Sequence, residues 1–240
     1  MDISKGCDMP LSKNDIVLVD YVVRVKESGE VIEVTDAEKA KEFKVFDPGK
    51  SYEPLLVVLG EGRVIKGFEE ALESSEVGVD AEVDIPPDKA YGVRDPNKVK
   101  TLSLRDFARA GVRPEVGKVV EVGGQLGTVR SVSGGRVVVD FNHPLAGKTL
   151  TYSFRVVKKL DEPVEKVKYL VKRYVRGVNV DDVKVSVDSE SSKVSIELPR
   201  NSYFSENIQI AKKLASDDIF KYLNFNEVIF IERYSKEGSK

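Results

Sequence analysis

Alternating apolar and polar positions dominate the first 90 residues and predict an antiparallel β-sheet. The stretch 15–34 alternates, is rich in Val and Tyr, and is interrupted at Ser28-Gly29, which predicts two strands joined by a turn. Residues 55–60 and 80–85 predict two further short strands. The polar, mixed stretch 37–50 predicts a loop, and the single helix expected here is short, at 69–73.

From Val93 onwards the pattern predicts a small unit that can pair with itself. Residues 98–102 suit a strand, and 103–111 suit a short helix with Ser103 as its N-cap and Gly111 at its end. Two Gly-Gly turns then separate three alternating stretches up to Phe141, which is typical of a meander. We therefore expect an insert at about 93–140, followed by one more strand at 148–160.

The last 80 residues differ again and predict a compact α+β domain. Two stretches have apolar residues at helical spacing, two alternate as a hairpin around DSESS, and EVIFIERY is apolar on both faces, as in an inner strand. The order is α-β-β-α-β, with enough apolar residues for an independent core. The two helical stripes are Val164, Val167, Val171, Tyr174 and Val178, then Ile208, Ala211, Ala215, Ile219 and Tyr222.

Composition narrows the possible functions. The 240 residues include 38 Lys+Arg and 40 Asp+Glu, a net charge of −2, so no overall basic field favours nucleic acid. No apolar run approaches the ~20 residues of a membrane span, and the N-terminus lacks the apolar segment of a signal peptide, so we expect a cytoplasmic protein. The single cysteine, Cys7, excludes an internal disulfide and a cysteine zinc cluster. The single histidine, His143, fits a structural or surface loop better than a catalytic role.

The stretch 60–72 reads GEGRVIKGFEEAL and raises the question of whether it binds phosphate. Counted from its second glycine, Phe68 and Glu69 stand where a P-loop requires Lys and Ser or Thr. Counted from its first glycine, Ile65 replaces the third glycine of a dinucleotide fingerprint. An acidic helix start also repels an anion. A phosphate site is therefore disfavoured, and the apolar Val64, Ile65 and Phe68 between glycines need another explanation.

Several pieces, in their order, resemble FKBP-type peptidyl-prolyl isomerases. They are NDIVLVDYVVRV, PLLVVLGEGRVIKGFEEAL and DKAYGVRDP, resumed by NHPLAGKTLTYSFRVV. The position of NHPLAGKTL after an insert is similar to the SlyD subgroup, whose insert-in-flap domain interrupts the isomerase domain. The extra C-terminal domain resembles the long archaeal members. The likeness covers about 10–160 closely, and for 161–240 it rests on domain order alone.

This resemblance implies the fold and its division. The α+β fold would comprise an antiparallel sheet wrapped on a short helix, a small mostly-β insert, and the C-terminal α-β-β-α-β domain. The isomerase domain would span 1–92 and 141–160, the client-binding insert 93–140, and the C-terminal domain 161–240.

The resemblance also implies a proline-binding pocket and explains the glycine-flanked loop. Four positions depart from the family pattern: Ile32 stands where Phe is usual, Glu33 for Asp, Leu55 for an aromatic residue and Phe68 for Trp. These changes make the pocket shallower and leave inhibitor affinity open. The implied catalytic residues are Tyr21, Glu33, Ile65, Phe68 and Tyr91, and the implied substrate-binding residues are Ile32, Leu55, Val64 and Tyr152.

The expected activity is isomerisation of Xaa-Pro bonds in unfolded or nascent polypeptides, without acid, base, nucleophile, cofactor or metal. The family's histidine-rich tail has no counterpart in RYSKEGSK. Two other possibilities are a non-catalytic holdase with a degenerate pocket and an RNA-binding tail helix, although a solvated face explains the basic residues of that helix. The C-terminal domain could form a homodimer. We expect clients to bind open apolar residues of the insert: Leu126, Val129, Val132, Val137 and Val139.

Overall fold

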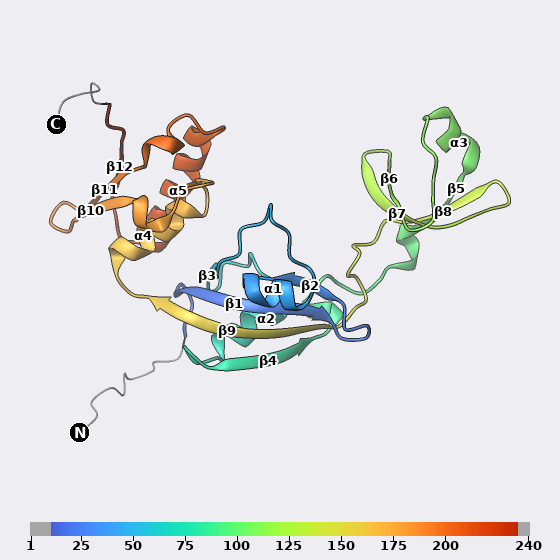
Figure 1. The fold of residues 1–240 in the computed structure, drawn as a ribbon, viewed down its shortest axis with the longest axis horizontal. Coiled ribbons are helices and arrows are strands. Elements are labelled where there is room, and N and C mark those ends of the chain that lie inside the picture. Colours follow the sequence, from blue (N-terminus) through green and yellow to red (C-terminus); the bar gives the residue numbers. More distant parts are fainter. Residues whose placement is uncertain (1–10, 235–240) are drawn as a thin grey trace.

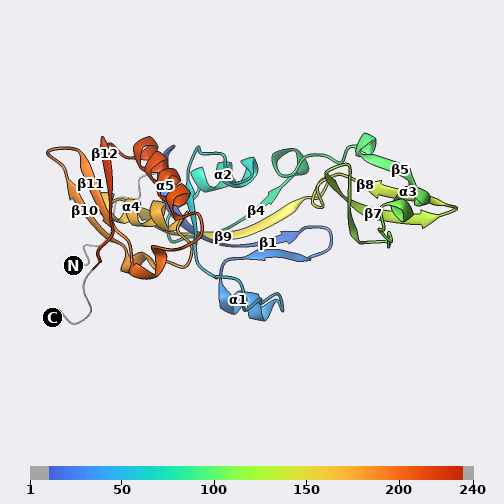
Figure 2. The ribbon, with the colours of Figure 1, turned by 90° about the horizontal axis from the view of Figure 1, so that it is seen from above.

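The computed structural model describes residues 11–234, so Cys7 lies outside the described part of the chain. Three β-sheets follow one another along the long axis of the molecule. Figure 1 shows a central sheet between the green insert and the orange C-terminal part, and Figure 2 shows the same order from above. The predicted α+β class is confirmed. Every helix within 11–234 is too short or too polar to cross a lipid bilayer.

The central sheet is antiparallel, with two long inner strands. Its order is β2-β1-β9-β4, and β3 pairs with the N-terminal half of β1. Because β2 pairs only with the C-terminal half of β1, Asp20 and Tyr21 lie at the gap between β3 and β2. The strands are β1 (Ile16–Val25), β2 (Val31–Val34), β3 (Leu55–Val58), β4 (Asp80–Ile85) and β9 (Leu150–Leu160).

Strand β1 is apolar on both faces because separate elements cover each of them. Val17 and Val19 face the cluster formed with helix α2 (Lys66–Glu73). Ile16 and Leu18 face the opposite way and belong to a cluster with residues of the C-terminal part. This two-sided burial accounts for the sequence IVLVDYVVRV, whose side chains alternate between two apolar environments.

A short helix replaces part of the loop predicted for 37–50, so that prediction was wrong for its first residues. Helix α1 (Ala37–Glu42) begins after Asp36, whose carboxylate accepts a hydrogen bond from the Lys39 N–H at 2.7 Å. Only Ala40 of this helix is buried. The sequence therefore has no apolar stripe that would indicate this helix, and the N-cap residue Asp36 is the one local feature that does.

The insert forms its own four-stranded antiparallel sheet, in the order β5-β8-β7-β6. The predicted helix and its N-cap are confirmed, since the Ser103 hydroxyl accepts a hydrogen bond from the Arg105 N–H at 3.2 Å. The elements are β5 (Val99–Ser103), α3 (Leu104–Arg109), β6 (Val119–Val122), β7 (Gln125–Ser133) and β8 (Arg136–Asp140).

Three of the five residues expected to bind clients are instead the core of the insert. Val129, Val137 and Val139 are fully buried and pack against one another and Phe107 of α3. They cannot contact a client in the folded insert, so this part of the prediction was wrong. Leu126 is 68% exposed and Val132 is 37% exposed. The alternating pattern identified an apolar face correctly, but the single short helix covers more of it than expected.

A polar cluster holds the two chain segments that join the insert to the central sheet. The buried Asp140 carboxylate forms ion pairs with Arg94 and with Arg130, the latter at 3.0 Å, and accepts hydrogen bonds from Asn142. Asn142 in turn pairs with the main chain of Asp95 through two bonds of 2.9 Å. Burial alone would raise the pKa of Asp140, but hydrogen bonds from Asn142 and the two arginines lower it below its ordinary value. We call these five residues the neck.

The C-terminal part has a three-stranded sheet in the order β10-β11-β12, packed against two helices. Within residues 11–234, strand β12 pairs only with β11, in parallel, so it is an edge strand and the prediction of an inner strand was wrong. The first helix ends at Lys172, so Tyr174 and Val178 lie beyond it. The elements are α4 (Pro163–Lys172), β10 (Lys184–Asp188), β11 (Lys193–Glu197), α5 (Ile208–Tyr222) and β12 (Glu227–Ile231).

The core of the C-terminal part is not independent of the central sheet. Ile16, Leu18 and Val58 are buried in the same cluster as Leu170 and Val171 of α4. The expected separate core therefore includes residues of β1 and β3. Because an apolar face that is buried in this way resists separation, the two parts are fixed relative to each other.

Candidate functional site

A cavity of about 410 Å³ opens between the central sheet and the loop that precedes α2. Eight of the nine pocket residues expected from the sequence line it. The exception is Ile32, which is 38% exposed. It has no partner residue on β1, because the register between β1 and β2 shifts at this point. The lining residues are Tyr21, Glu33, Leu55, Gly62, Arg63, Val64, Ile65, Phe68, Tyr91 and Tyr152.

Aromatic rings form the floor of the cavity. Phe68 is buried, and its ring centroid lies 4.4 Å from that of Tyr152 and 5.6 Å from that of Tyr21. The ring of Phe154 packs edge-on against the ring of Phe68, with 5.3 Å between the ring centroids. Rings at these separations and tilts attract one another, which keeps the floor rigid.

Helix α2 sits close to the sheet because its second residue is a glycine. A Cβ atom at Gly67 would lie 2.4 Å from Cγ2 of Ile85 on β4, so a larger residue would push the helix outwards. Phe68 follows directly, and its depth in the cavity therefore depends on this close approach.

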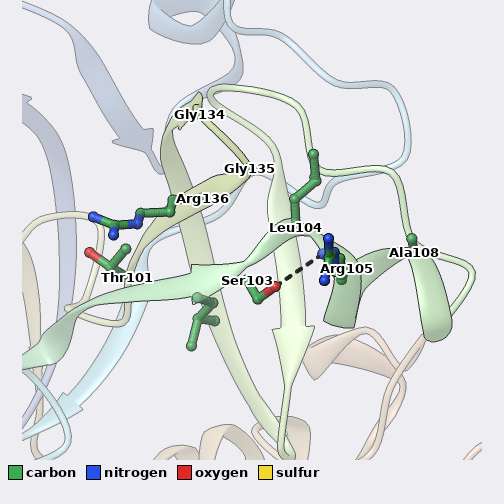
Figure 3. Close-up of a pocket in the computed structure, with 9 residues that line it drawn as sticks. Thr101, Ser103, Leu104, Arg105, Ala108, Gly134, Gly135 and Arg136 are labelled. Carbon is green, nitrogen blue, oxygen red and sulfur yellow. Dashed lines mark hydrogen bonds between the residues drawn. The ribbon is translucent and has the colours of Figure 1, made fainter.

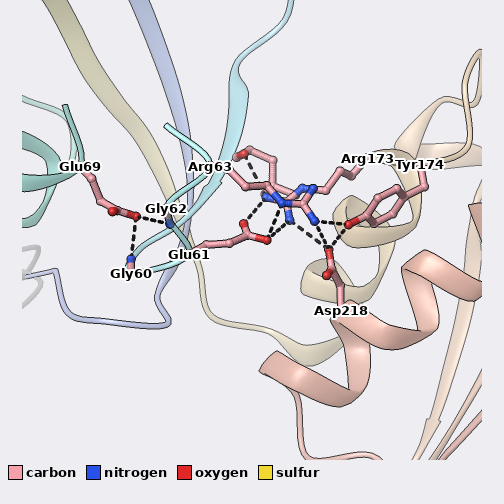
Figure 4. A network of polar contacts seen from close by, with 9 residues as sticks. Gly60, Glu61, Gly62, Arg63, Glu69, Arg173, Tyr174 and Asp218 are labelled. Carbon is pink, nitrogen blue, oxygen red and sulfur yellow. Dashed lines mark hydrogen bonds and ion pairs between the residues drawn. The ribbon is translucent and has the colours of Figure 1, made fainter. Parts of the chain in front are cut away.

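The loop before α2 is held by a carboxylate. The Glu69 side chain accepts hydrogen bonds from the N–H groups of Gly60 and Gly62, at 2.9 and 3.1 Å (Figure 4). Both glycines have positive φ, which favours residues without a Cβ atom. These amides are already occupied by an anionic group, which agrees with the argument against a phosphate site. The loop instead presents Val64 and Ile65 to the cavity.

Two tyrosine hydroxyl groups of the cavity stay protonated. Burial raises the pKa of Tyr21 well above its ordinary value, and the neighbouring Glu33 carboxylate raises it further. Burial likewise raises the pKa of Tyr152, with smaller contributions from Tyr91 and Glu33. Both hydroxyl groups are therefore able to donate a hydrogen bond over the physiological pH range.

Thr35 fixes the main chain of Tyr21, a role that sequence reasoning missed. The Tyr21 N–H donates to the Thr35 hydroxyl at 2.9 Å, and the Thr35 N–H donates to the Tyr21 carbonyl at 3.1 Å. The same hydroxyl donates to Asp20 at 2.9 Å. Thr35 thus closes the gap that β2 and β3 leave along β1. A β-branched residue after a strand gives no sequence signal for such a contact.

Arg63, also missed from the sequence, connects the cavity to the C-terminal part. It forms an ion pair with Glu61 at 2.7 Å and donates to the Tyr174 hydroxyl. Glu61 lies 3.0 Å from Arg173, which also lies 3.0 Å from Asp218 of α5 (Figure 4). The side chains of Glu61, Arg173 and Asp218 are nearly buried, so these charges are screened little by solvent.

A second cavity, of about 370 Å³, adjoins the first and is lined partly by α4. A third, of about 710 Å³, lies in the insert beside α3 and the Gly134-Gly135 turn (Figure 3). Ser103, Leu104 and Arg136 border this insert cavity. The residues expected to bind clients do not line it.

Family comparisons match the three parts of the chain in order. The sequence model of the FKBP-type peptidyl-prolyl cis-trans isomerases matches residues 7–104, that of the FKBP26 IF domain matches 100–145, and that of the FKBP26 C-terminal domain matches 163–235.

Similar proteins are also peptidyl-prolyl isomerases by name. A short-type peptidyl-prolyl cis-trans isomerase of Methanocaldococcus jannaschii is 39% identical over 146 residues, which cover 61% of this chain and 92% of the relative. An FKBP-type 16 kDa isomerase of Escherichia coli is 31% identical over 62% of this chain and 93% of the relative. The SlyD isomerase of Helicobacter pylori is 32% identical over 58% of this chain and 70% of the relative.

Proposed function

The chain belongs to the FKBP-type peptidyl-prolyl cis-trans isomerases, and we propose that its cavity above Phe68 holds the proline of an Xaa-Pro bond while that bond rotates. The observation that carries this proposal is the aromatic floor, with the rings of Tyr21 and Tyr152 arranged around Phe68. A proline ring is apolar and compact, and it fits against such a surface without any charged partner.

Catalysis requires only that the twisted amide bind better than the planar one. Rotation about the C–N bond costs ~18–20 kcal/mol because the twist removes amide resonance. The planar amide is the more polar form, so a dry apolar cavity disfavours it relative to the twisted form. Neither acid, base nor nucleophile takes part, and no covalent bond forms or breaks.

Polar groups at the rim orient the peptide. No hydrogen bond from the Ile65 N–H forms within residues 11–234, so this group can donate to a substrate carbonyl. Tyr91 also lines the cavity, and its hydroxyl group would orient a second peptide carbonyl, while Glu33 would hold Tyr21 or the rotating carbonyl. Val64 and Leu55 supply apolar walls. Ile32 takes no part in this proposal, because it lies outside the cavity.

The experiment that tests this function is isomerisation of a short Xaa-Pro tetrapeptide by the full chain. We expect acceleration at substoichiometric protein and strong loss of activity in Val64→Arg, which puts a charge into the cavity. Val79→Arg is the matched control, because Val79 is exposed and outside the cavity. Absence of acceleration by the parent protein would favour the alternative, a non-catalytic holdase with a degenerate pocket.

We further propose that residues 93–140 bind unfolded clients for the isomerase domain of 1–92 and 141–160. The support comes from β6, which is an edge strand of the insert sheet. Val119 on β6 is 61% exposed, and Leu126 on the neighbouring strand β7 is also exposed. An extended client can add to such an edge as a further strand through main-chain hydrogen bonds. Because these bonds do not involve the client's side chains, this mode of binding suits clients of many sequences. The tethered client then has a raised local concentration near the cavity.

Replacing residues 94–140 by a short Gly-containing turn tests the role of the insert. This deletion should leave tetrapeptide isomerisation largely intact and sharply reduce proline-limited refolding of a protein client. Equal refolding rates for the shortened and parent proteins would mean that the insert is only a structural lid.

We also propose that the C-terminal domain of 161–240 forms a homodimer. Ile210 and Leu214 are exposed one turn apart on α5, and one edge of β12 is unpaired within residues 11–234. Sedimentation of the full chain tests this, and a strict monomer at micromolar concentration would refute it.

A further inference from the structure

We infer that the C-terminal domain forms one wall of the substrate-binding site. The groove adjoining the catalytic cavity, closed on one side by α4, would take the extended polypeptide that flanks the isomerised proline. This inference rests on the proposed function of the cavity, and it assigns to the C-terminal domain a direct part in substrate recognition.

The groove, the second cavity of about 370 Å³ described above, adjoins the catalytic cavity. Tyr21, Glu33 and Leu55 line both spaces, so a peptide that passes these three residues on leaving the cavity reaches the groove. The groove has a volume of about 370 Å³, which is of the size of a few residues of extended peptide.

The two walls of the groove come from different domains. On one side lies the segment before β3, including Lys50, Ser51 and Glu53. On the other side lie Tyr169 and Lys172 of α4. A peptide in this groove would therefore touch both domains at once, and removing the C-terminal domain would remove one wall.

Buried contacts keep the C-terminal wall in place before any substrate arrives. Arg173 lies between Glu61 and Asp218 in the network of Figure 4 and also donates to the Leu56 carbonyl at 3.4 Å. Lys172 forms an ion pair with Glu53, which also lines the groove. The apolar cluster shared by β1 and α4 adds to this rigidity. A preformed groove costs little ordering entropy when a peptide binds.

The chemistry of the walls favours a main chain over a strongly charged ligand. Each of the two lysines has a carboxylate neighbour, since Lys50 lies 3.7 Å from Glu33 and Lys172 pairs with Glu53. The fields of these pairs largely cancel. Ser51 and Tyr169 line the groove together with the apolar Leu55 and Leu56 of β3, a mixture that suits an extended peptide of varied sequence.

The test compares a tetrapeptide with a peptide of about 12 residues that has the same Xaa-Pro bond at its centre, both with the full chain. Lys172→Glu places like charge beside Glu53, and Ser51→Trp fills the groove from the opposite wall. Lys166→Glu is the matched control, because it makes the same charge change on α4 outside the groove. Circular dichroism and thermal unfolding verify that each variant folds.

We expect both groove variants to raise KM for the long peptide about fivefold with kcat unchanged, which is the signature of lost binding common to the ground and transition states. Tetrapeptide kinetics and the Lys166→Glu control should not change. Equal effects on both peptides, or none on the long one, would overturn the inference while leaving the proposed function standing. Failure of the parent protein to isomerise the tetrapeptide would instead overturn the proposed function, and this inference with it.

Discussion

The ring of His143 lies parallel to the ring of Tyr91, with planes 2° and centroids 4.1 Å apart. His143 is held in turn by its Nδ1 atom, which accepts a hydrogen bond from the Leu145 N–H at 3.2 Å. Tyr91 lines the cavity and is 39% exposed, and the histidine ring packs against one face of its ring. The single histidine, expected to be a structural loop residue, thus contacts a candidate catalytic residue.

Replacing His143 with Ala should lower kcat/KM on a tetrapeptide about threefold to tenfold, because Tyr91 loses the ring that orients it, a change of ~1 kcal/mol. His143→Phe keeps a stacking ring and should retain most of the activity. Steady-state kinetics of the two variants measure this difference. If both variants behave like the parent protein, the stack does not position Tyr91.

Replacing Tyr91 with Ala should lower the same activity at least several-fold while the fold survives. Tyr91→Phe then separates the two contributions of this residue, since it keeps the stacked ring and removes the hydroxyl. If the activity depends on the Tyr91 hydroxyl group, kcat/KM should fall in Tyr91→Phe as well as in Tyr91→Ala. Unchanged kinetics in Tyr91→Ala would place the active site elsewhere.

Replacing Arg173 with Met should lower the free energy of unfolding by about 2 kcal/mol, because it removes the more buried of the two arginines that pair with the Glu61 and Asp218 carboxylates and leaves only the half-exposed Arg63 beside them. Arg176→Met is the matched control, since Arg176 is exposed just beyond α4 and should change stability little. Urea titration followed by circular dichroism measures both. If Arg173→Met lowers the free energy of unfolding no more than Arg176→Met does, solvent compensates the Glu61 and Asp218 charges.

Cutting the chain after Leu160 should leave an isomerase that is less stable than the full chain. Ile16, Leu18 and Val58 are buried against the C-terminal domain and would become exposed. At about 1.5–3 kcal/mol for each buried side chain, the free energy of unfolding should fall by at least ~4 kcal/mol. Replacing these three residues with Thr in the shortened chain should lessen its aggregation. A shortened chain as stable as the parent would show that the shared cluster contributes little.

Acid should loosen the neck before it unfolds the central sheet. The folded-state pKa of Asp140 is lowered, so its stabilising effect is complete above the ordinary carboxyl pKa of about 3.9 and is lost as pH falls through the lower folded value. Asp140→Asn should therefore lower stability at pH 7 and flatten its dependence on pH below about 4. Proteolysis at the neck and thermal unfolding between pH 7 and pH 3 measure this. Parallel pH profiles for the two proteins would contradict it.

The sequence predicts elements that depend on local pattern better than those that depend on distant partners. Strand β4 and the three-stranded meander of the insert follow alternation directly. Helix α1 does not, because it buries only Ala40. The edge position of β12 depends on a parallel pairing with β11, and an apolar pattern alone cannot distinguish an edge strand covered by helices from an inner strand.

The same distinction applies to the candidate site. The resemblance identified the residues that line the cavity because they lie in recognisable segments. The contacts of Thr35 with Tyr21, of His143 with Tyr91 and of Arg63 with Tyr174 join residues far apart in the chain, and no local pattern encodes them. Ile32 was misplaced because a register shift of one residue moves a side chain away from its expected environment.

Strand β1 contributes to two cores, and this orders the assembly of the protein during its synthesis. Ile16 of β1 pairs with Leu160 of β9. Strand β1 is synthesised early, and its principal partner β9 is synthesised only at the end of the isomerase domain. The insert, whose strands pair only among themselves, can fold before that moment. The C-terminal core needs Ile16 and Leu18 already in place, so it closes last. The nascent chain can therefore carry a folded insert while its central sheet is still open.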